Sequence, residues 1–167
     1  MLRFTVLAFA LTAVLADGED KRKCMRVFHP GSMHCCKNDM MPPKGEKDVK
    51  EELKECFKMP HAHHSCEHDI CVGKKLGFAS DDGTVDMDAW EKVITEQFKS
   101  NPTLLEAVKE NCIKGDISKY GPPDACQLAK LKMCLHRSII LDCKEWDDNG
   151  PCAGMKDLVV ECAKMDE

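Results

Sequence analysis

The sequence predicts an all-α fold held together by disulfide bonds. Apolar residues recur at helical spacing in six segments after residue 46, and no segment alternates apolar and polar residues for long enough to form a convincing strand. Twelve cysteines, an even number, follow an apolar leader, which indicates a disulfide framework. We therefore expect a compact bundle of about six or seven helices, stapled by up to six disulfides.

Residues 1–16 have the features of a signal peptide. Arg3 precedes an apolar run that ends in small residues before Asp17, and the run is shorter than the roughly 20 residues that cross a bilayer. We expect a secreted, extracellular protein in which residues 17–167 form a single helical domain. Its first part, residues 17–45, shows little periodicity and is predicted to be a loop-rich arm tethered by disulfides.

The first predicted helix covers residues 47–59. Val49, Leu53 and Cys56 share one face, lysines and glutamates fill the other, and Pro60 stops the helix.

Two further helices follow at capping residues. Ser65 suits the start of a helix that runs to about Leu76, and Gly77 suits its exit. Asp86 is the expected cap of a third helix, whose apolar stripe ends at Phe98.

The remaining predicted helices complete the bundle. Asn101, followed by proline, opens a helix that ends near Gly115. A turn at residues 121–123 precedes the longest helix, which runs to about Cys143, and a final helix begins at Cys152.

The charge and the motifs exclude several classes of function. The formal net charge is −5, and about −6 once Arg3 is removed, so nucleic acid and anionic membrane surfaces are poor partners. The sequence contains no nucleophile-elbow, metalloprotease or phosphate-loop pattern, so we expect no enzymatic activity, no catalytic residue and no cofactor. Stable membrane insertion is not expected, and the sequence leaves the oligomeric state open.

The sequence offers two metal hypotheses, and neither is favoured. His61, His63, His64 and His68 lie beside Cys66, but a disulfide-bonded cysteine is no zinc ligand and a solvated loop is the simpler interpretation. Residues 82–86 resemble half of a calcium loop, yet the expected ligand positions hold a phenylalanine and an alanine. We therefore predict no metal site.

The cysteine spacing resembles that of the insect odorant-binding proteins, especially their twelve-cysteine "Plus-C" branch. The twelve positions are Cys24, Cys35, Cys36, Cys56, Cys66, Cys71, Cys112, Cys126, Cys134, Cys143, Cys152 and Cys162. The resemblance spans most of the chain after the leader and also includes the acidic turn at residues 77–86. The six core cysteines that it implies are Cys36, Cys66, Cys71, Cys112, Cys134 and Cys143.

Three departures leave the register of the core cysteines open. Four residues, instead of the usual three, separate Cys66 from Cys71, and Lys144 stands where that branch has proline. The interval from Cys143 to Cys152 equals that from Cys134 to Cys143, so Cys143 and Cys152 are an alternative for the last two core positions.

The resemblance also implies a disulfide pairing. The core bonds would join Cys36 with Cys71, Cys66 with Cys134, and Cys112 with Cys143. The other six cysteines would tie the arm and the last helix to this core.

A carrier of small hydrophobic ligands is the function that the resemblance implies, with the helices enclosing an apolar cavity. Its ligand would be an odorant or pheromone, its medium sensillar lymph, and its partner an olfactory receptor. Tyr120 or Thr95 would supply a selective hydrogen bond, and the histidines could make release pH-dependent. Residues of the apolar helix faces, which ordinary core packing explains equally well, would line the cavity: Trp90, Val93, Ile94, Phe98, Leu104, Leu105, Val108, Leu128, Leu131, Leu135 and Ile139.

Two alternatives belong to other classes of function. One is a secreted protein-interaction module that uses the acidic surface or the disulfide-bound arm. The other is a lipophilic carrier that acts outside olfaction.

Overall fold

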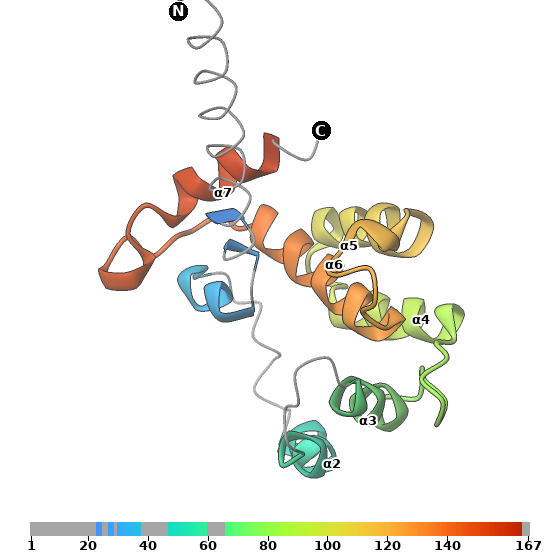
Figure 1. The fold of residues 1–167 in the computed structure, drawn as a ribbon. Helices are drawn as coiled ribbons and strands as arrows, with labels where there is room; N and C mark the ends of the chain where they lie inside the picture. The colour runs from blue at the N-terminus through green and yellow to red at the C-terminus, as the bar shows by residue number, and fades with distance from the viewer. Residues whose placement is uncertain (1–22, 25–26, 29, 38–46, 60–65, 165–167) are drawn as a thin grey trace, which may run out of the picture. The chain divides into compact units, whose positions relative to one another are not determined.

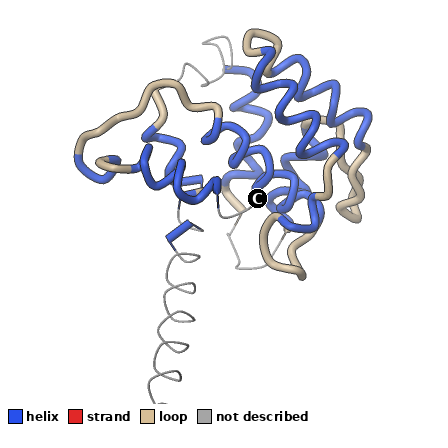
Figure 2. The backbone as a smooth tube through the Cα atoms, turned by 90° about the horizontal axis from the view of Figure 1, so that it is seen from above, coloured by secondary structure: helices blue, strands red, loops and turns tan. Residues whose placement is uncertain are grey.

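The computed structural model describes residues 23–24, 27–28, 30–37, 47–59 and 66–164. The predicted signal peptide, much of the predicted arm, and His61, His63, His64 and Ser65 lie outside the described residues. Figure 2 shows helices and loops in the described part of the chain, and no strand. The all-α prediction is confirmed by the six α-helices that these described ranges contain: α2 (Lys47–Phe57), α3 (Glu67–Lys75), α4 (Met87–Gln97), α5 (Pro102–Val108), α6 (Gln127–Leu141) and α7 (Met155–Lys164).

The predicted capping residues start α4 and α5. Asp86 Oδ1 accepts a hydrogen bond from the backbone N–H of Ala89 at 3.0 Å, and Asn101 Oδ1 accepts one from Leu104 at 3.2 Å. Gly77, with a φ of +80°, follows the end of α3 in the left-handed conformation that glycine tolerates best. These boundaries were predictable because a cap is a local interaction between a side chain and the next turn.

The structure differs from the predicted helices in three places. The helix after Asn101 changes from α to π geometry at Lys109, and the π-helical segment η2 (Lys109–Lys114) ends at Gly115. Helix α6 begins at Gln127 rather than near Pro123, because Cys126 has an extended backbone. Helix α7 begins at Met155, since Gly154 has a φ of +74° and separates it from a short 3-10 turn, Gly150–Cys152.

The chain divides into two compact units, and each disulfide joins two cysteines of the same unit. The terminal unit comprises Met1–Lys37 and Cys143–Glu167, and the central unit comprises Asn38–Asp142. Each unit contains three disulfides, with Cys24–Cys162, Cys35–Cys152 and Cys36–Cys143 in the terminal unit and Cys56–Cys71, Cys66–Cys126 and Cys112–Cys134 in the central unit. All twelve cysteines are therefore paired, as the sequence predicted. That residues 17–167 form a single domain stays a prediction.

The predicted pairing is wrong in every core bond. Cys71 pairs with Cys56 instead of Cys36, Cys66 with Cys126 instead of Cys134, and Cys112 with Cys134 instead of Cys143. The alternative register, with Cys143 and Cys152 in the core, is also wrong because both belong to the terminal unit. The three bonds of the terminal unit join the arm to the C-terminal segment, and none of them reaches the central core.

The central unit is built around α6. Helices α3 and α5 pack against α6, as do η2 and the 3-10 turn Ile117–Lys119, while α2 packs on α3 and α4 on η2 (Figure 1). The terminal unit has its own small core, in which Val27, Val159 and three cysteines are buried. No helix in the described part of the chain is long and apolar enough to cross a membrane.

Candidate functional site

The predicted ligand-binding residues all lie in the central unit. Helix α4 packs on η2, and both η2 and α5 pack on α6. The apolar faces of α4, α5 and α6 therefore belong to one interior. Val93, Leu105 and Leu135 are half-buried. The other eight are buried: Trp90, Ile94, Phe98, Leu104, Val108, Leu128, Leu131 and Ile139. This interior is the candidate site for an apolar ligand, and its side chains are packed as a core.

A disulfide and a buried hydroxyl lie where η2 meets α6. Cys112 and Cys134 are fully buried, and their bond fixes the π-helical segment to the middle of α6. Ser138 Oγ donates to the carbonyl of Cys134 at 3.0 Å and lies 3.7 Å from Cys112 Sγ. Sequence reasoning missed this serine. The available signal was its position, four residues after a core cysteine and on the apolar face of the helix. It places one polar group inside the candidate site.

The beginning of α5 is linked to the end of α6. Asn101 Nδ2 donates to Asp142 Oδ2 at 2.8 Å, while Asn101 Oδ1 caps α5. Asp142 is only 9% exposed. One amide therefore joins the two helices whose apolar faces form much of the candidate site.

A tight hairpin, residues 78–86, follows the C-terminal end of α3. The backbone N–H of Asp86 donates to the carbonyl of Phe78 at 2.9 Å, and Asp82 accepts from the Thr84 N–H at 3.0 Å and from the Ser80 hydroxyl. These hydrogen bonds, led by that of Ser80, lower the pKa of Asp82 from 3.8 to about 2. The acidic turn singled out in the sequence is thus a hydrogen-bonded turn with ordinary structural roles for its aspartates.

The histidine that the structure describes in the predicted cluster joins an ion pair. His68 Nδ1 lies 3.4 Å from Asp69 Oδ1, and both Asp69 oxygens accept from Lys132 Nζ, at 2.6 and 2.8 Å. Asp69 and Lys132 connect α3 to α6 across 63 residues of sequence. Cys66, beside the histidine cluster, is bonded to Cys126, as expected of a cysteine in a disulfide framework. The geometry at His68 therefore supports a helix-to-helix contact.

An open pocket of about 410 Å³ lies on the solvent side of α4. Thr95 and four charged residues line it, and none of the predicted apolar residues contributes to it. Lys109 Nζ, on η2, contacts Glu91 at 2.9 Å, and this hydrogen bond lowers the pKa of Glu91. The full lining is Asp88, Glu91, Lys92, Thr95 and Glu96. A small apolar molecule would gain little by binding there.

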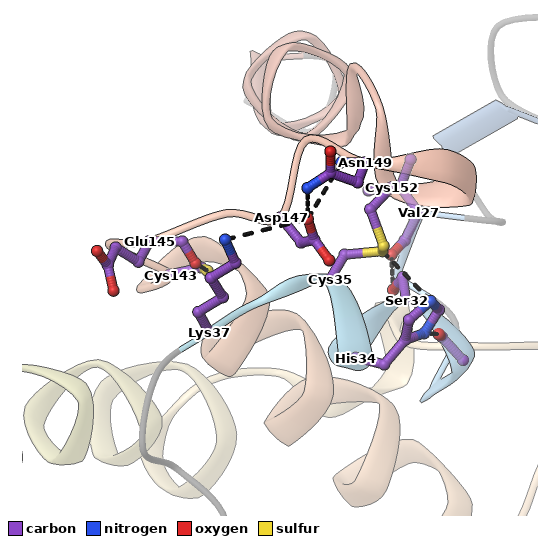
Figure 3. Close-up of a disulfide and its surroundings, with 11 residues drawn as sticks. Val27, Ser32, His34, Cys35, Lys37, Cys143, Glu145, Asp147, Asn149 and Cys152 are labelled. Carbon is purple, nitrogen blue, oxygen red and sulfur yellow. Dashed lines mark hydrogen bonds and ion pairs between the residues drawn. A yellow bond between two sulfur atoms is a disulfide. The ribbon is translucent and has the colours of Figure 1, made fainter.

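Among the residues of the terminal unit that the structure describes, one arrangement resembles a metal site. His34, Cys35 and Cys152 have their potential ligand atoms within 4.8 Å of one another. Figure 3 shows that the two sulfur atoms form a disulfide, and His34 Nε2 lies 3.5 Å from Cys35 Sγ. Disulfide sulfurs carry no negative charge to offer a metal, so these residues have a structural role.

The chain was compared with protein-family models, with curated proteins and with solved structures, and none of the three comparisons found a match.

Proposed function

We propose that the protein is an extracellular carrier whose central unit reversibly binds a small hydrophobic molecule of the odorant or pheromone type. The order of the disulfides in the central unit is the observation that supports this most. Along the chain, Cys56, Cys66, Cys71, Cys112, Cys126 and Cys134 pair first with third, second with fifth, and fourth with sixth.

That order is the one implied by the resemblance to odorant-binding proteins, although it is realised by a different six cysteines. Cys56 takes the place expected for Cys36, and the last two positions move forward to Cys126 and Cys134. Six cysteines allow about 15 pairings, so agreement by chance is uncommon. The shared order supports the resemblance, and with it the carrier function.

Binding would take place among the apolar faces of α4, α5 and α6. Each Å² of apolar ligand surface removed from water would contribute about 25 cal/mol. Because the predicted residues are packed as a core, a ligand would have to displace side chains, and half-buried Leu105 and Leu135 are the most accessible of them on α5 and α6. Ser138, buried within this interior, is a better placed polar group than Thr95 on the open face of α4.

The test is displacement of an environment-sensitive apolar fluorophore, N-phenyl-1-naphthylamine, from the oxidised protein by a panel of volatile and long-chain lipophilic compounds. We expect saturable displacement at micromolar concentration. Leu135→Gln should weaken binding at least tenfold, because it puts a polar amide in the proposed site. Val160→Gln, at an exposed valine of α7, is the matched control and should leave affinity unchanged.

Absence of fluorophore uptake by the folded protein would contradict the carrier function and favour the protein-interaction module. Equal effects of the two glutamine variants would place binding outside the α4–α6 interior. Expression of the protein in a tissue other than olfactory organs would instead favour a carrier that acts outside olfaction.

A further inference from the structure

The six disulfides differ in how accessible their cysteines are to a thiol in solution. Both residues are buried in two bonds, Cys35–Cys152 and Cys112–Cys134, and one residue is buried in two others, Cys24–Cys162 and Cys56–Cys71. Both residues are half-buried in the remaining two, Cys36–Cys143 and Cys66–Cys126. Access to sulfur is the first requirement for thiol–disulfide exchange, so these two bonds are the candidates for reaction.

The charges beside the two accessible bonds are opposite. A lysine follows each cysteine of the first bond, Lys37 after Cys36 and Lys144 after Cys143, whereas Glu67 follows Cys66 in the second. Positive charge attracts the attacking thiolate and stabilises the departing one, and negative charge does the reverse. The Cys36–Cys143 bond is therefore favoured on both grounds.

Acidic groups also lie near Cys36–Cys143: Asp142 and Asp147 accept hydrogen bonds, whereas Glu145, two residues after Cys143, is exposed. Asp142, which precedes Cys143, accepts from Asn101 Nδ2. Asp147 accepts from the backbone N–H and the side-chain amide of Asn149, at 3.1 and 2.8 Å, and lies 4.0 Å from Lys37 Nζ (Figure 3). Lys37 keeps a side chain that is 52% exposed, so its charge remains available to an approaching anion.

This bond closes the smallest of the three loops that the disulfides of the terminal unit form. Cys36 and Cys143 lie at the two places where the chain passes from the terminal unit to the central unit, and their bond closes a loop of 107 residues that contains the whole central unit. Cys35–Cys152 and Cys24–Cys162 enclose the same segment in larger loops, of 117 and 138 residues, and the three bonds of the central unit lie inside it.

We infer that Cys36–Cys143 is a thiol-exchange site, the disulfide that a small thiol such as glutathione reduces first. The thiolate of one glutathione attacks one sulfur, the Cys36–Cys143 bond breaks, and the other cysteine leaves as a thiolate that takes a proton from water. A second glutathione thiolate then attacks the mixed disulfide and releases the first cysteine, forming glutathione disulfide. Two glutathione thiols thus supply the two electrons.

The test uses the full-length oxidised protein in graded concentrations of glutathione. Exchange is stopped with acid, free thiols are alkylated, and labelled cysteines are identified by peptide mass spectrometry. We expect label on Cys36 and Cys143 while the other ten cysteines remain oxidised. Emission from buried Trp90 in the central unit should then be unchanged. Label that appears first on any other pair, or on all twelve cysteines together, overturns the inference.

Substitutions that reverse the charges beside the two accessible bonds test whether charge governs their rates of reduction. Lys37→Glu with Lys144→Glu should slow reduction of Cys36–Cys143 several-fold, and Glu67→Lys should speed reduction of Cys66–Cys126. All three positions are exposed, so the variants should fold. If the rates of both bonds are unchanged, the neighbouring charges do not select the bond and the electrostatic argument is overturned. If the lysine-to-glutamate variant speeds its own bond, the electrostatic argument is wrong.

Discussion

Gly73 shows how the absence of a side chain shapes the central unit. It is buried in α3, and its carbonyl accepts hydrogen bonds from the N–H groups of Phe78 and Ala79, at 2.9 and 3.2 Å. A Cβ at this position would lie 2.7 Å from Ala79 Cβ and 3.1 Å from Phe78 Cε2. The hairpin therefore packs against the helix at a separation that only glycine allows.

Replacing Gly73 with alanine should destabilise the central unit by about 1–3 kcal/mol, the usual cost of overpacking. Denaturant unfolding followed by Trp90 fluorescence in a Trp146→Phe background measures this change. The second substitution Ala79→Gly removes the closest contact and should restore part of the stability. If the change in the free energy of unfolding of the double variant equals the sum of the changes in the two single variants, crowding is not the cause.

Asp82 makes the hairpin resistant to mild acid. Its pKa is lowered to about 2 in the folded protein, so its stabilising effect is complete above the ordinary value of 3.8 and is lost as the pH falls through about 2. We expect the Thr84 amide to stay hydrogen-bonded at pH 3.5. An NMR titration of the Asp82 carboxyl carbon checks this, and a midpoint near 4 would contradict the geometry. Asp82→Asn should lose this titration and leave the others unchanged.

At the scale of helices, Asn101 should contribute more than an ordinary cap. Asn101→Ala removes both the cap of α5 and a donor to the buried carboxylate of Asp142, so we expect a loss of about 2–3 kcal/mol. Asp86→Ala removes only the cap of α4 and should cost about 1 kcal/mol. The two variants are compared by urea unfolding. Equal losses would mean that the bond from Asn101 to Asp142 contributes no net stability.

The helices also show where sequence reasoning succeeds and where it stops. Asp86, Asn101 and Gly77 were assigned correctly because each acts within a few residues of its own position. The π geometry of η2 was not predicted, since the periodicity around Cys112 fits either helix type and the bond to Cys134 forms only in the folded chain.

The pairing of the cysteines could not be obtained from their spacing. Cys126, Cys134, Cys143 and Cys152 follow one another at similar intervals, so the sequence alone does not show where one unit ends and the next begins. Their assignment depends on contacts between segments that are up to 138 residues apart. The apolar site residues were easier to select because a helical stripe marks burial, whereas it does not distinguish a ligand pocket from a packed core.

At the scale of the whole molecule, the two units should respond separately to the loss of a disulfide. Each contains one of the two tryptophans, Trp90 in the central unit and Trp146 in the terminal unit. Replacing Cys112 and Cys134 with serine should lower the stability reported by Trp90 by about 2–4 kcal/mol. Replacing Cys35 and Cys152 should do the same for Trp146. Single-tryptophan variants measure each transition, and identical shifts at both tryptophans would show one cooperative domain.

The division of the disulfides also has a consequence for the order of oxidation during synthesis. A chain made from its N-terminus presents all six cysteines of the central unit once residue 134 has emerged, so these bonds can form early. Cys24, Cys35 and Cys36 emerge before them, yet their partners are the last three cysteines to appear. They must remain reduced, or exchange out of wrong bonds, while the whole central unit is made. Maturation of this protein therefore requires either that these three thiols stay reduced or that wrong bonds isomerise, a step that takes seconds to hours.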